Sequence, residues 1–173
     1  MTHAGPSLIA ALALTAVGML PAGARADRLV TRDPDAAFDA VEIRGVRGHQ
    51  MEFVLQGQLQ RVPLRNIRLI QIDSLPILSR AETLADQGRH ADCIDLYQAV
   101  RDQAVFRDWV DIRLTTAYDR EGRFDRAVAA YIGLLTRLPA DAMPPDLRPS
   151  NLPPRARAAQ LRTSVSDIDA ALP

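Results

Sequence analysis

The side chains best suited to chemistry in this sequence are two histidines and one cysteine. His49 and His90 are the histidines that follow the first 26 residues, and Cys93 is the only cysteine. His90 and Cys93 stand three residues apart, which on a helix would place two metal ligands on one face. A closed zinc site needs four ligands, and no Cys-x-x-Cys or His-x-x-x-His pair stands elsewhere. We therefore expect no metal site. His90 and Cys93 are interpreted as helix-packing residues, and His49, beside Gly48, as an exposed turn residue.

Aspartates form further patterns that could carry chemistry. Asp33, Asp35 and Asp39 resemble the start of a calcium loop, but the glycine at its sixth position and its terminal glutamate are missing. Two more patterns are pairs at helical spacing, Asp92 with Asp95 and Asp108 with Asp111. Such pairs are typical of a solvated helix face. No serine stands in a Gly-x-Ser-x-Gly context. We expect no catalytic residue and no cofactor, and the sequence predicts a protein that is not an enzyme.

The charge composition excludes several classes of function. The chain has 21 arginines, no lysine and 21 acidic residues, so its formal net charge is zero. A Walker-type phosphate loop, a Schiff base and a Ser-Lys dyad each need an ammonium group, and guanidinium cannot replace it because it does not deprotonate. A protein that binds nucleic acid or an anionic membrane would carry a basic excess. We expect neither partner.

Residues 1–26 have the pattern of an export signal. Leu8–Leu20 is an uncharged apolar run, and Ala24, Arg25 and Ala26 follow it as a small-x-small cleavage sequence. The run is shorter than the roughly 20 residues that span a bilayer. We expect cleavage after Ala26, a periplasmic or secreted bacterial protein, and no membrane contact after cleavage. An uncleaved membrane anchor is the alternative.

The pattern of residues 27–73 predicts short antiparallel strands, because apolar and polar residues alternate. Four strands are expected, Val41–Ile43, Met51–Leu55, Leu59–Leu64 and Ile67–Ile72, or five with Arg28–Thr31. Gly48 and Gly57 fall where turns are needed, and Pro63 fits a strand end or an edge strand. This rhythm resembles a small SH3-like or Sm-like barrel. A barrel of this size buries little surface, so we expect it to pack against the segment that follows.

From residue 74 the apolar period becomes helical, and the chain repeats itself at an offset of 34 residues. The offset pairs Gly88 with Gly122, Arg89 with Arg123, Cys93 with Ala127, Ile94 with Val128, Tyr97 with Tyr131 and Val100 with Leu134. The glycines favour a turn between antiparallel helices, and the small residues let paired helices touch. The repeat therefore predicts two helical pairs within residues 74–139.

This period and these residues resemble the tetratricopeptide repeat family, whose unit is a helix–turn–helix of that length. The matching positions are Gly88, Cys93 and Tyr97 in the first copy, and Leu114, Tyr118, Gly122, Phe124, Ala127, Tyr131 and Pro139 in the second. The resemblance implies that the whole chain is an α+β protein. It also implies a groove, lined by the first helix of each pair, that binds an extended peptide or a partner protein.

The resemblance places seven candidate partner-binding residues in that groove. They are Glu82 and Asp86 from the first copy, and Trp109, Ile112, Arg113, Thr116 and Arg120 from the second. Trp109 and the arginines have the composition of interface anchors. The alternative is that Trp109 packs between the repeats with Phe106, and that Arg113 and Arg120 pair with Asp119, Glu121 or Asp86.

The C-terminal part of the sequence is expected to close the array, because two repeats are fewer than the three or so that are usually stable alone. Residues 140–154 are rich in proline and predict an extended linker. In residues 155–173 an apolar stripe (Ala158, Leu161, Val165, Ile168, Leu172) predicts a capping helix. The hypothesis from the sequence is an exported, non-enzymatic interaction or scaffold protein. The alternative is a structural envelope protein that associates with itself.

Overall fold

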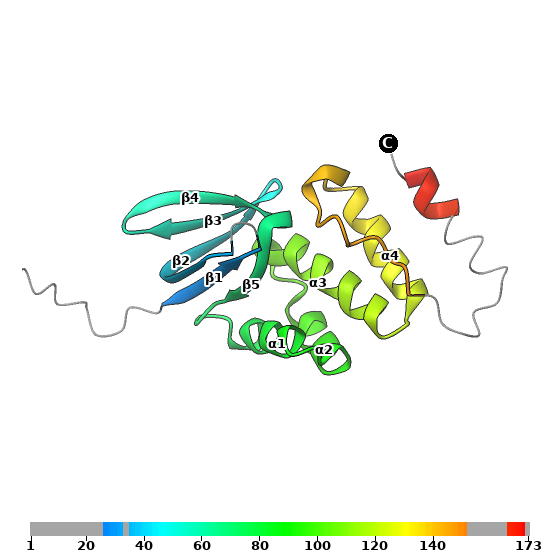
Figure 1. The fold of residues 1–173 in the computed structure, drawn as a ribbon, viewed down its shortest axis with the longest axis horizontal. Helices are drawn as coiled ribbons and strands as arrows, with labels where there is room; N and C mark the ends of the chain where they lie inside the picture. Colours follow the sequence, from blue (N-terminus) through cyan, green and yellow to red (C-terminus); the bar gives the residue numbers. More distant parts are fainter. Residues whose placement is uncertain (1–25, 33–34, 152–165, 172–173) are drawn as a thin grey trace, which may run out of the picture.

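The structure, a computed structural model, describes residues 26–32, 35–151 and 166–171. A β-sheet lies at one end of the molecule and the helices lie beside and beyond it (Figure 1). The strands come first in the chain: β1 (Asp27–Thr31), β2 (Ala37–Arg47), β3 (Gln50–Leu55), β4 (Gln58–Pro63) and β5 (Ile67–Gln71). The helices α1 (Pro76–Asp86), α2 (His90–Val100), α3 (Arg107–Arg120) and α4 (Phe124–Leu135) follow, and residues 166–171 are also helical. The predicted α+β class is confirmed.

The five strands form one antiparallel sheet in the order β4-β3-β2-β1-β5. Gly48 and Gly57 lie in its two tight turns with φ of 62° and 79°, a backbone conformation that favours glycine. All five predicted strands are present. The expectation of a barrel is wrong, because the sheet does not close: β4 pairs with β3 alone, and β5 with β1 alone, among the described strands.

The outer edge of β5 is covered by α1, which is the physical reason that the sheet stays open. The backbone N–H of Ile70 donates to the Glu82 carboxylate at 3.4 Å. Directly after β5, the N–H of Ile72 donates to the Ser79 hydroxyl at 2.6 Å. These side chains provide the acceptors that a closing strand would otherwise provide.

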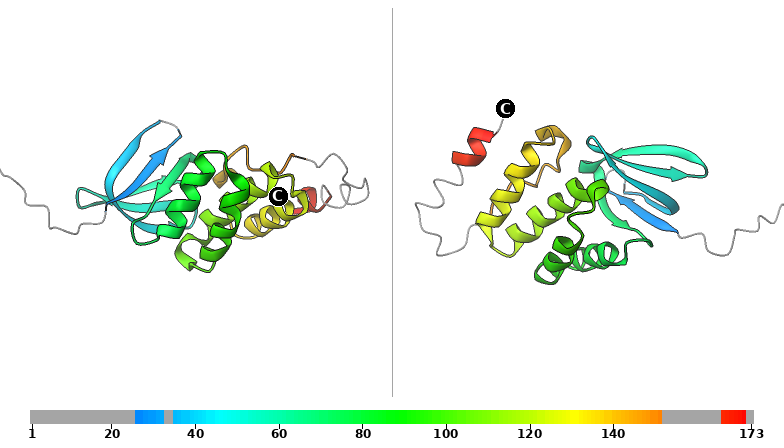
Figure 2. Two further views of the ribbon diagram at one scale, coloured as in Figure 1. Left: turned by 90° about the horizontal axis from the view of Figure 1, so that it is seen from below. Right: turned by 180° about the vertical axis from the view of Figure 1, so that it is seen from behind.

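The first four helices form two consecutive hairpins, α1 with α2 and α3 with α4, and α2 also packs against α3 (Figure 2). Their two connections share one geometry. The N–H of Gly88 donates to the carbonyl of Ala85, and the N–H of Gly122 to the carbonyl of Asp119, each at 3.0 Å. Both glycines have positive φ, 75° and 66°. The turns predicted at these two glycines are confirmed.

After α4 the chain runs back along the helices (Figure 1). Several of its apolar side chains are buried: Leu138, Ala142, Met143 and Leu147. Asp119 holds the end of this segment, because its carboxylate accepts the backbone N–H groups of Ser150 and Asn151, each at 2.8 Å. The proline-rich segment therefore belongs in large part to the packed structure.

The helix at 166–171 lies within the predicted capping helix 155–173 and buries Ile168. Asp169 of this helix pairs with Arg148 at 2.7 Å. The predicted start of the capping helix lies outside the described residues, as do Asp33 and all of the expected export signal except Ala26. None of the described helices has the length and apolar character needed to cross a membrane.

Gly45 lies where the sheet meets the helical part. It has φ of 129°, and a Cβ added to it would come within 2.9 Å of the Val105 Cβ and 3.0 Å of the Val105 carbonyl oxygen. Val105 belongs to the short 3₁₀ turn Ala104–Phe106 that precedes α3. Only a residue without a side chain allows β2 to approach this turn so closely.

We predict that Gly45→Ala lowers the free energy of unfolding by about 1–3 kcal/mol, because it overpacks this contact and strains the backbone. Urea denaturation measures the change. Gly133→Ala is the matched control, since its added Cβ would meet only the end of Arg137 at 3.7 Å within α4. The control is expected to be neutral or to add up to about 1 kcal/mol. Equal effects of the two substitutions would contradict the prediction.

Candidate functional site

Four of the seven predicted partner-binding residues converge in the interior between β5 and the first three helices. Glu82, Trp109 and Ile112 have 0%, 1% and 2% of their surface exposed. The Arg113 side chain is 11% exposed. Trp109 is buried, in line with the alternative that it packs inside the molecule. Arg113 pairs with an acid, but this acid is Glu82 and none of the three that the alternative named.

Glu82 is the centre of this cluster, because three elements besides its own helix donate to it. Its Oε1 accepts the Tyr97 hydroxyl at 2.7 Å, the Trp109 Nε1 at 3.1 Å and the Arg113 Nε at 3.0 Å. Its Oε2 accepts the N–H of Ile70 in β5 at 3.4 Å. One carboxylate thus connects α1 to α2, α3 and the sheet.

Arg113 balances the charge of Glu82 and packs beside the aromatic groups. Its Nε also donates to the Tyr97 hydroxyl at 3.2 Å, and its guanidinium lies 5.3 Å from the centre of the Trp109 ring. Burial alone would lower the pKa of Arg113, but Glu82 and Tyr97 outweigh it and raise that pKa. Burial, and then the charge of Glu82, raise the pKa of Tyr97 well above its ordinary value.

This cluster is a closed structural network. Every buried side-chain nitrogen or oxygen in the described part of the chain has a hydrogen-bond partner. The Glu82 carboxylate is fully enclosed, so a substrate has no path to it without separating the sheet from the helices. The arrangement can hold the first three helices and the sheet in a fixed position relative to one another.

The face of α1 that was expected to line a groove for a partner is covered by β5. Leu78 and Glu82 are buried, and the Ser79 hydroxyl both accepts the N–H of Ile72 at 2.6 Å and donates to its carbonyl at 2.9 Å. The sheet therefore occupies the place that the tetratricopeptide resemblance gives to an external peptide.

The other three predicted residues reach the surface. Asp86 and Arg120 are exposed, and Thr116 is half-buried with its hydroxyl on the Ile112 carbonyl at 3.2 Å. We call these three residues the polar strip. Asp86 and Arg120 occupy equivalent positions of the two hairpins, near the ends of α1 and α3. Burial, and then the charge of Arg120, lower the pKa of the nearby His90.

A second buried acid was missed by the sequence analysis, which expected Asp108 and Asp111 to be solvated. Asp111 is 1% exposed, and its two oxygens accept Arg101 at 2.7 Å and Arg137 at 2.5 Å. Arg137 also donates to Asp108 at 2.8 Å. Arg101 directly follows α2, and Arg137 stands two residues after the end of α4, so that only folding brings both to Asp111 of α3.

The remaining chemistry-bearing residues are separate from one another. His49 is exposed beside Gly48, Asp39 pairs with Arg28 at 3.1 Å, and Asp92 pairs with Arg89 on the surface. The Cys93 thiol is buried and donates to the His90 carbonyl at 3.2 Å. Across the described ranges, no three His, Cys, Asp or Glu side chains are arranged to hold a metal ion.

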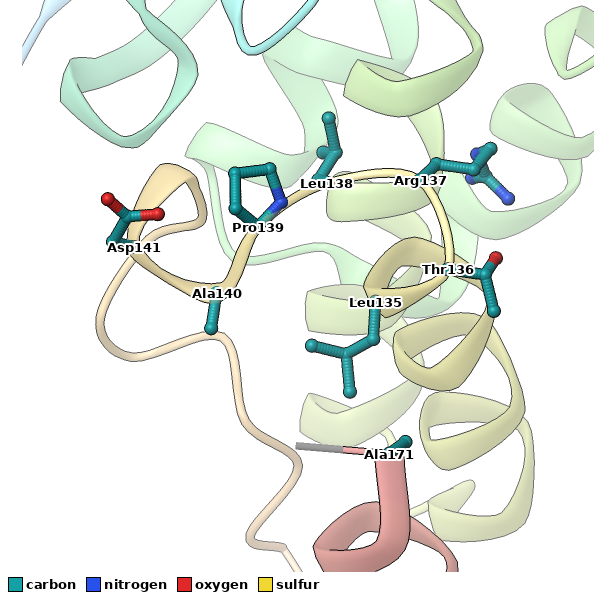
Figure 3. A pocket seen from close by; sticks show the side chains of 8 residues that line it. All are labelled: Leu135, Thr136, Arg137, Leu138, Pro139, Ala140, Asp141 and Ala171. Atoms are coloured by element: carbon teal, nitrogen blue, oxygen red, sulfur yellow. The ribbon is translucent and has the colours of Figure 1, made fainter. Parts of the chain in front are cut away.

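A hollow of about 680 Å³ lies at the C-terminal end of α4, beside the helix at 166–171 (Figure 3). It is lined by Leu135, Thr136, Arg137, Leu138, Pro139, Ala140, Asp141 and Ala171. The Arg137 side chain points away from the hollow, toward its aspartate partners. Mainly apolar groups are left to face it.

No family model matches this chain, and no curated protein or solved structure matches it significantly.

We predict that Glu82→Gln lowers the free energy of unfolding by about 3–5 kcal/mol, because it leaves the Arg113 charge buried without its counter-ion. Denaturant titration followed by Trp109 fluorescence measures the change. Glu42→Gln is the matched control, since its pair with Arg44 has side chains 61% and 57% exposed. The control is expected to change stability by less than about 0.5 kcal/mol. A similar small effect of both substitutions would show that the buried pair is not a main support of the fold.

Burial raises the pKa of the Cys93 thiol to about 11 from an ordinary value of 9.0. Between pH 9 and about pH 11 the folded chain therefore keeps this proton, whereas the unfolded chain loses it. The free energy of unfolding consequently falls as the pH rises through this range. We predict that Cys93→Ala loses less stability than the original chain between about pH 9 and pH 11. Denaturant titrations at several pH values measure the two slopes, and equal slopes would contradict the assignment.

Proposed function

We propose that this chain is a non-enzymatic protein-interaction scaffold built on two tetratricopeptide-like hairpins, exported to the bacterial periplasm. Its partner is a protein or an extended peptide, which contacts the polar strip of Asp86, Thr116 and Arg120. Catalysis, nucleic-acid binding and membrane binding form no part of the proposal.

The observation that carries the proposal is the recurrence of one backbone geometry at the 34-residue offset. Arg89 and Arg123 start α2 and α4 with φ, ψ of −84°, 62° and −84°, 59°. Their N–H groups donate to the carbonyls of Leu84 and Tyr118 at the same distance, 2.9 Å. Equal turns at a fixed period generate stacked helical pairs, whose surfaces commonly serve as binding platforms.

The polar strip supports the choice of surface because it combines both charge signs at equivalent positions of the hairpins. Among the described residues Asp86 makes only a long pair with Arg68, 3.9 Å apart with both side chains about half exposed. Arg120 is exposed at the corresponding end of α3. Both charges are thus accessible to an incoming segment, and they favour one that carries an acid and a base.

The β module supports the proposal in a different way. By covering α1 it provides the packing that a third repeat would otherwise provide.

Self-association is the second candidate function, favoured by the apolar hollow at the end of α4. Leu135, Pro139 and Ala171 line it, and a second copy could bury them. Light scattering across a range of concentrations distinguishes the two proposals. A monomer at all concentrations excludes self-association as the function.

We predict that an affinity-tagged chain recovers a specific partner from a periplasmic extract of the producing bacterium, and that Asp86→Ala with Arg120→Ala lowers the recovery at least about tenfold. Quantitative mass spectrometry measures the recovery. Asp95→Ala with Arg123→Ala is the matched control, because it removes the same two residue types from exposed positions outside the strip. Equal recovery by both double variants would exclude the strip, and recovery of no partner by the original chain would contradict the scaffold function.

A further inference from the structure

The two edges of the sheet differ in how their backbone groups are satisfied. At β5 the side chains of Glu82 and Ser79 accept outward N–H groups, as described above. On one side β4 pairs with β3, and on its other side no described strand pairs with it. The residues from Gln58 to Arg61 are all exposed. Edge strands of this kind are usually protected by charges, a bulge or a covering element. Arg61 and the terminal Pro63 are the only such features that β4 has.

The register identifies which backbone groups of β4 point outward. The two-residue turn Gln56-Gly57, with φ of 52° and 79°, closes the β3–β4 hairpin. Leu55 and Gln58 beside such a turn exchange hydrogen bonds, and bonded pairs alternate along the ladder. Leu59 and Arg61 therefore direct their N–H and C=O groups away from β3. These four groups can accept a further strand.

A groove of about 480 Å³ lies beside this edge, on the face of the sheet that carries the Leu59 side chain. Its apolar lining comes from Val46 of β2, from Val54 and Leu59 of the β3–β4 hairpin and from Val105 of the 3₁₀ turn. Leu59 and Val105 are 54% and 50% exposed, two of the three large apolar side chains at the described surface that are exposed to this degree. The groove thus crosses from β2 to β4, and Leu59 is its apolar residue on β4, next to backbone that pairs with no described strand.

The charges around the groove favour an acidic ligand. Glu52 pairs with Arg61 at 2.8 Å and with Arg47 at 3.8 Å, and Glu42 pairs with Arg44 at 2.9 Å. Three arginines therefore face two glutamates. The Arg44, Arg47 and Arg61 side chains are 57%, 80% and 53% exposed, so they remain accessible to a further carboxylate.

We propose that the edge of β4 binds an extended segment of a partner protein as a sixth strand. The segment places an apolar side chain beside Leu59 and, two residues along the same face, an acidic side chain next to Arg61. A second copy of this chain fits less well, because two β4 edges would bring two sets of the three arginines together. The site is separate from the polar strip, so either can fail without the other.

The test uses the purified protein and a fluorescein-labelled peptide, Thr-Val-Thr-Glu-Thr-Val-Thr, followed by fluorescence anisotropy at low salt. The control peptide has Lys in place of Glu. The acidic peptide is expected to bind at least about tenfold more tightly than the lysine peptide. Equal binding of the two peptides, or no binding of the acidic one, would overturn the proposal.

Two variants locate the binding at β4. Leu59→Pro removes an outward N–H without removing a bond to β3, and Leu59→Asp places a like charge in the path of the acidic peptide. Each should weaken binding at least about tenfold. If Leu59→Pro does not fold, as judged by circular dichroism, Leu59→Asp decides alone. Ile77→Asp is its matched control, because Ile77 is 46% exposed on α1, and it should leave binding unchanged.

Two results would assign the edge differently. Undiminished binding by the folded variants would exclude β4 as the site. A dimer of the original chain in sedimentation velocity that Leu59→Asp converts to monomer would show that a second copy occupies the edge, and the acidic-segment proposal would then fall.

Discussion

The arrangement of this molecule depends on one buried carboxylate. Glu82 has no exposed surface, yet it accepts hydrogen bonds from Tyr97, Trp109, Arg113 and the backbone of Ile70. Such a group is costly to bury, and only a complete set of donors offsets the loss of its hydration. Because those donors come from α2, α3 and β5, the carboxylate is satisfied only when the sheet and both hairpins are docked together.

Docking the sheet in this way changes which surfaces are left for function. A helical repeat presents the first helix of each pair to its partner, but here β5 covers that face of α1 and the segment at Ser150 and Asn151 binds Asp119 near the end of α3. The chain therefore covers with its own residues much of the helix face that the tetratricopeptide resemblance gives to a partner. The surfaces that we propose for contact with other proteins, the polar strip, the hollow at α4 and the edge of β4, all lie outside this covered face. Closure of a short array and an open groove are competing uses of the same helix face.

The sequence allowed the local structure to be predicted better than the contacts between elements. Strand alternation and the period of 34 residues are local patterns, so the strands and the turns at Gly88 and Gly122 could be located. The bond from Arg113 to Glu82 joins residues 31 apart, and no periodic pattern indicates it. Burial of Asp111 was missed for the same reason, since its partners follow two different helices. The open sheet could not be foreseen either, because it depends on the side chains that α1 turns toward β5.

The choice of arginine over lysine has a physical meaning at one interior position, residue 113. A buried lysine can lose its proton and become neutral, whereas arginine keeps its charge at any accessible pH. Arg113 is therefore a permanent cation in the interior, and its environment raises its pKa further. A permanent buried charge tolerates only those packings that keep a carboxylate beside it, and among the described residues Glu82 occupies that place. Any packing of the sheet and helices that separates Arg113 from Glu82 would leave a buried charge unpaired. The pair therefore favours one arrangement of the sheet against the helices, even though a buried ion pair of this kind adds little net stability.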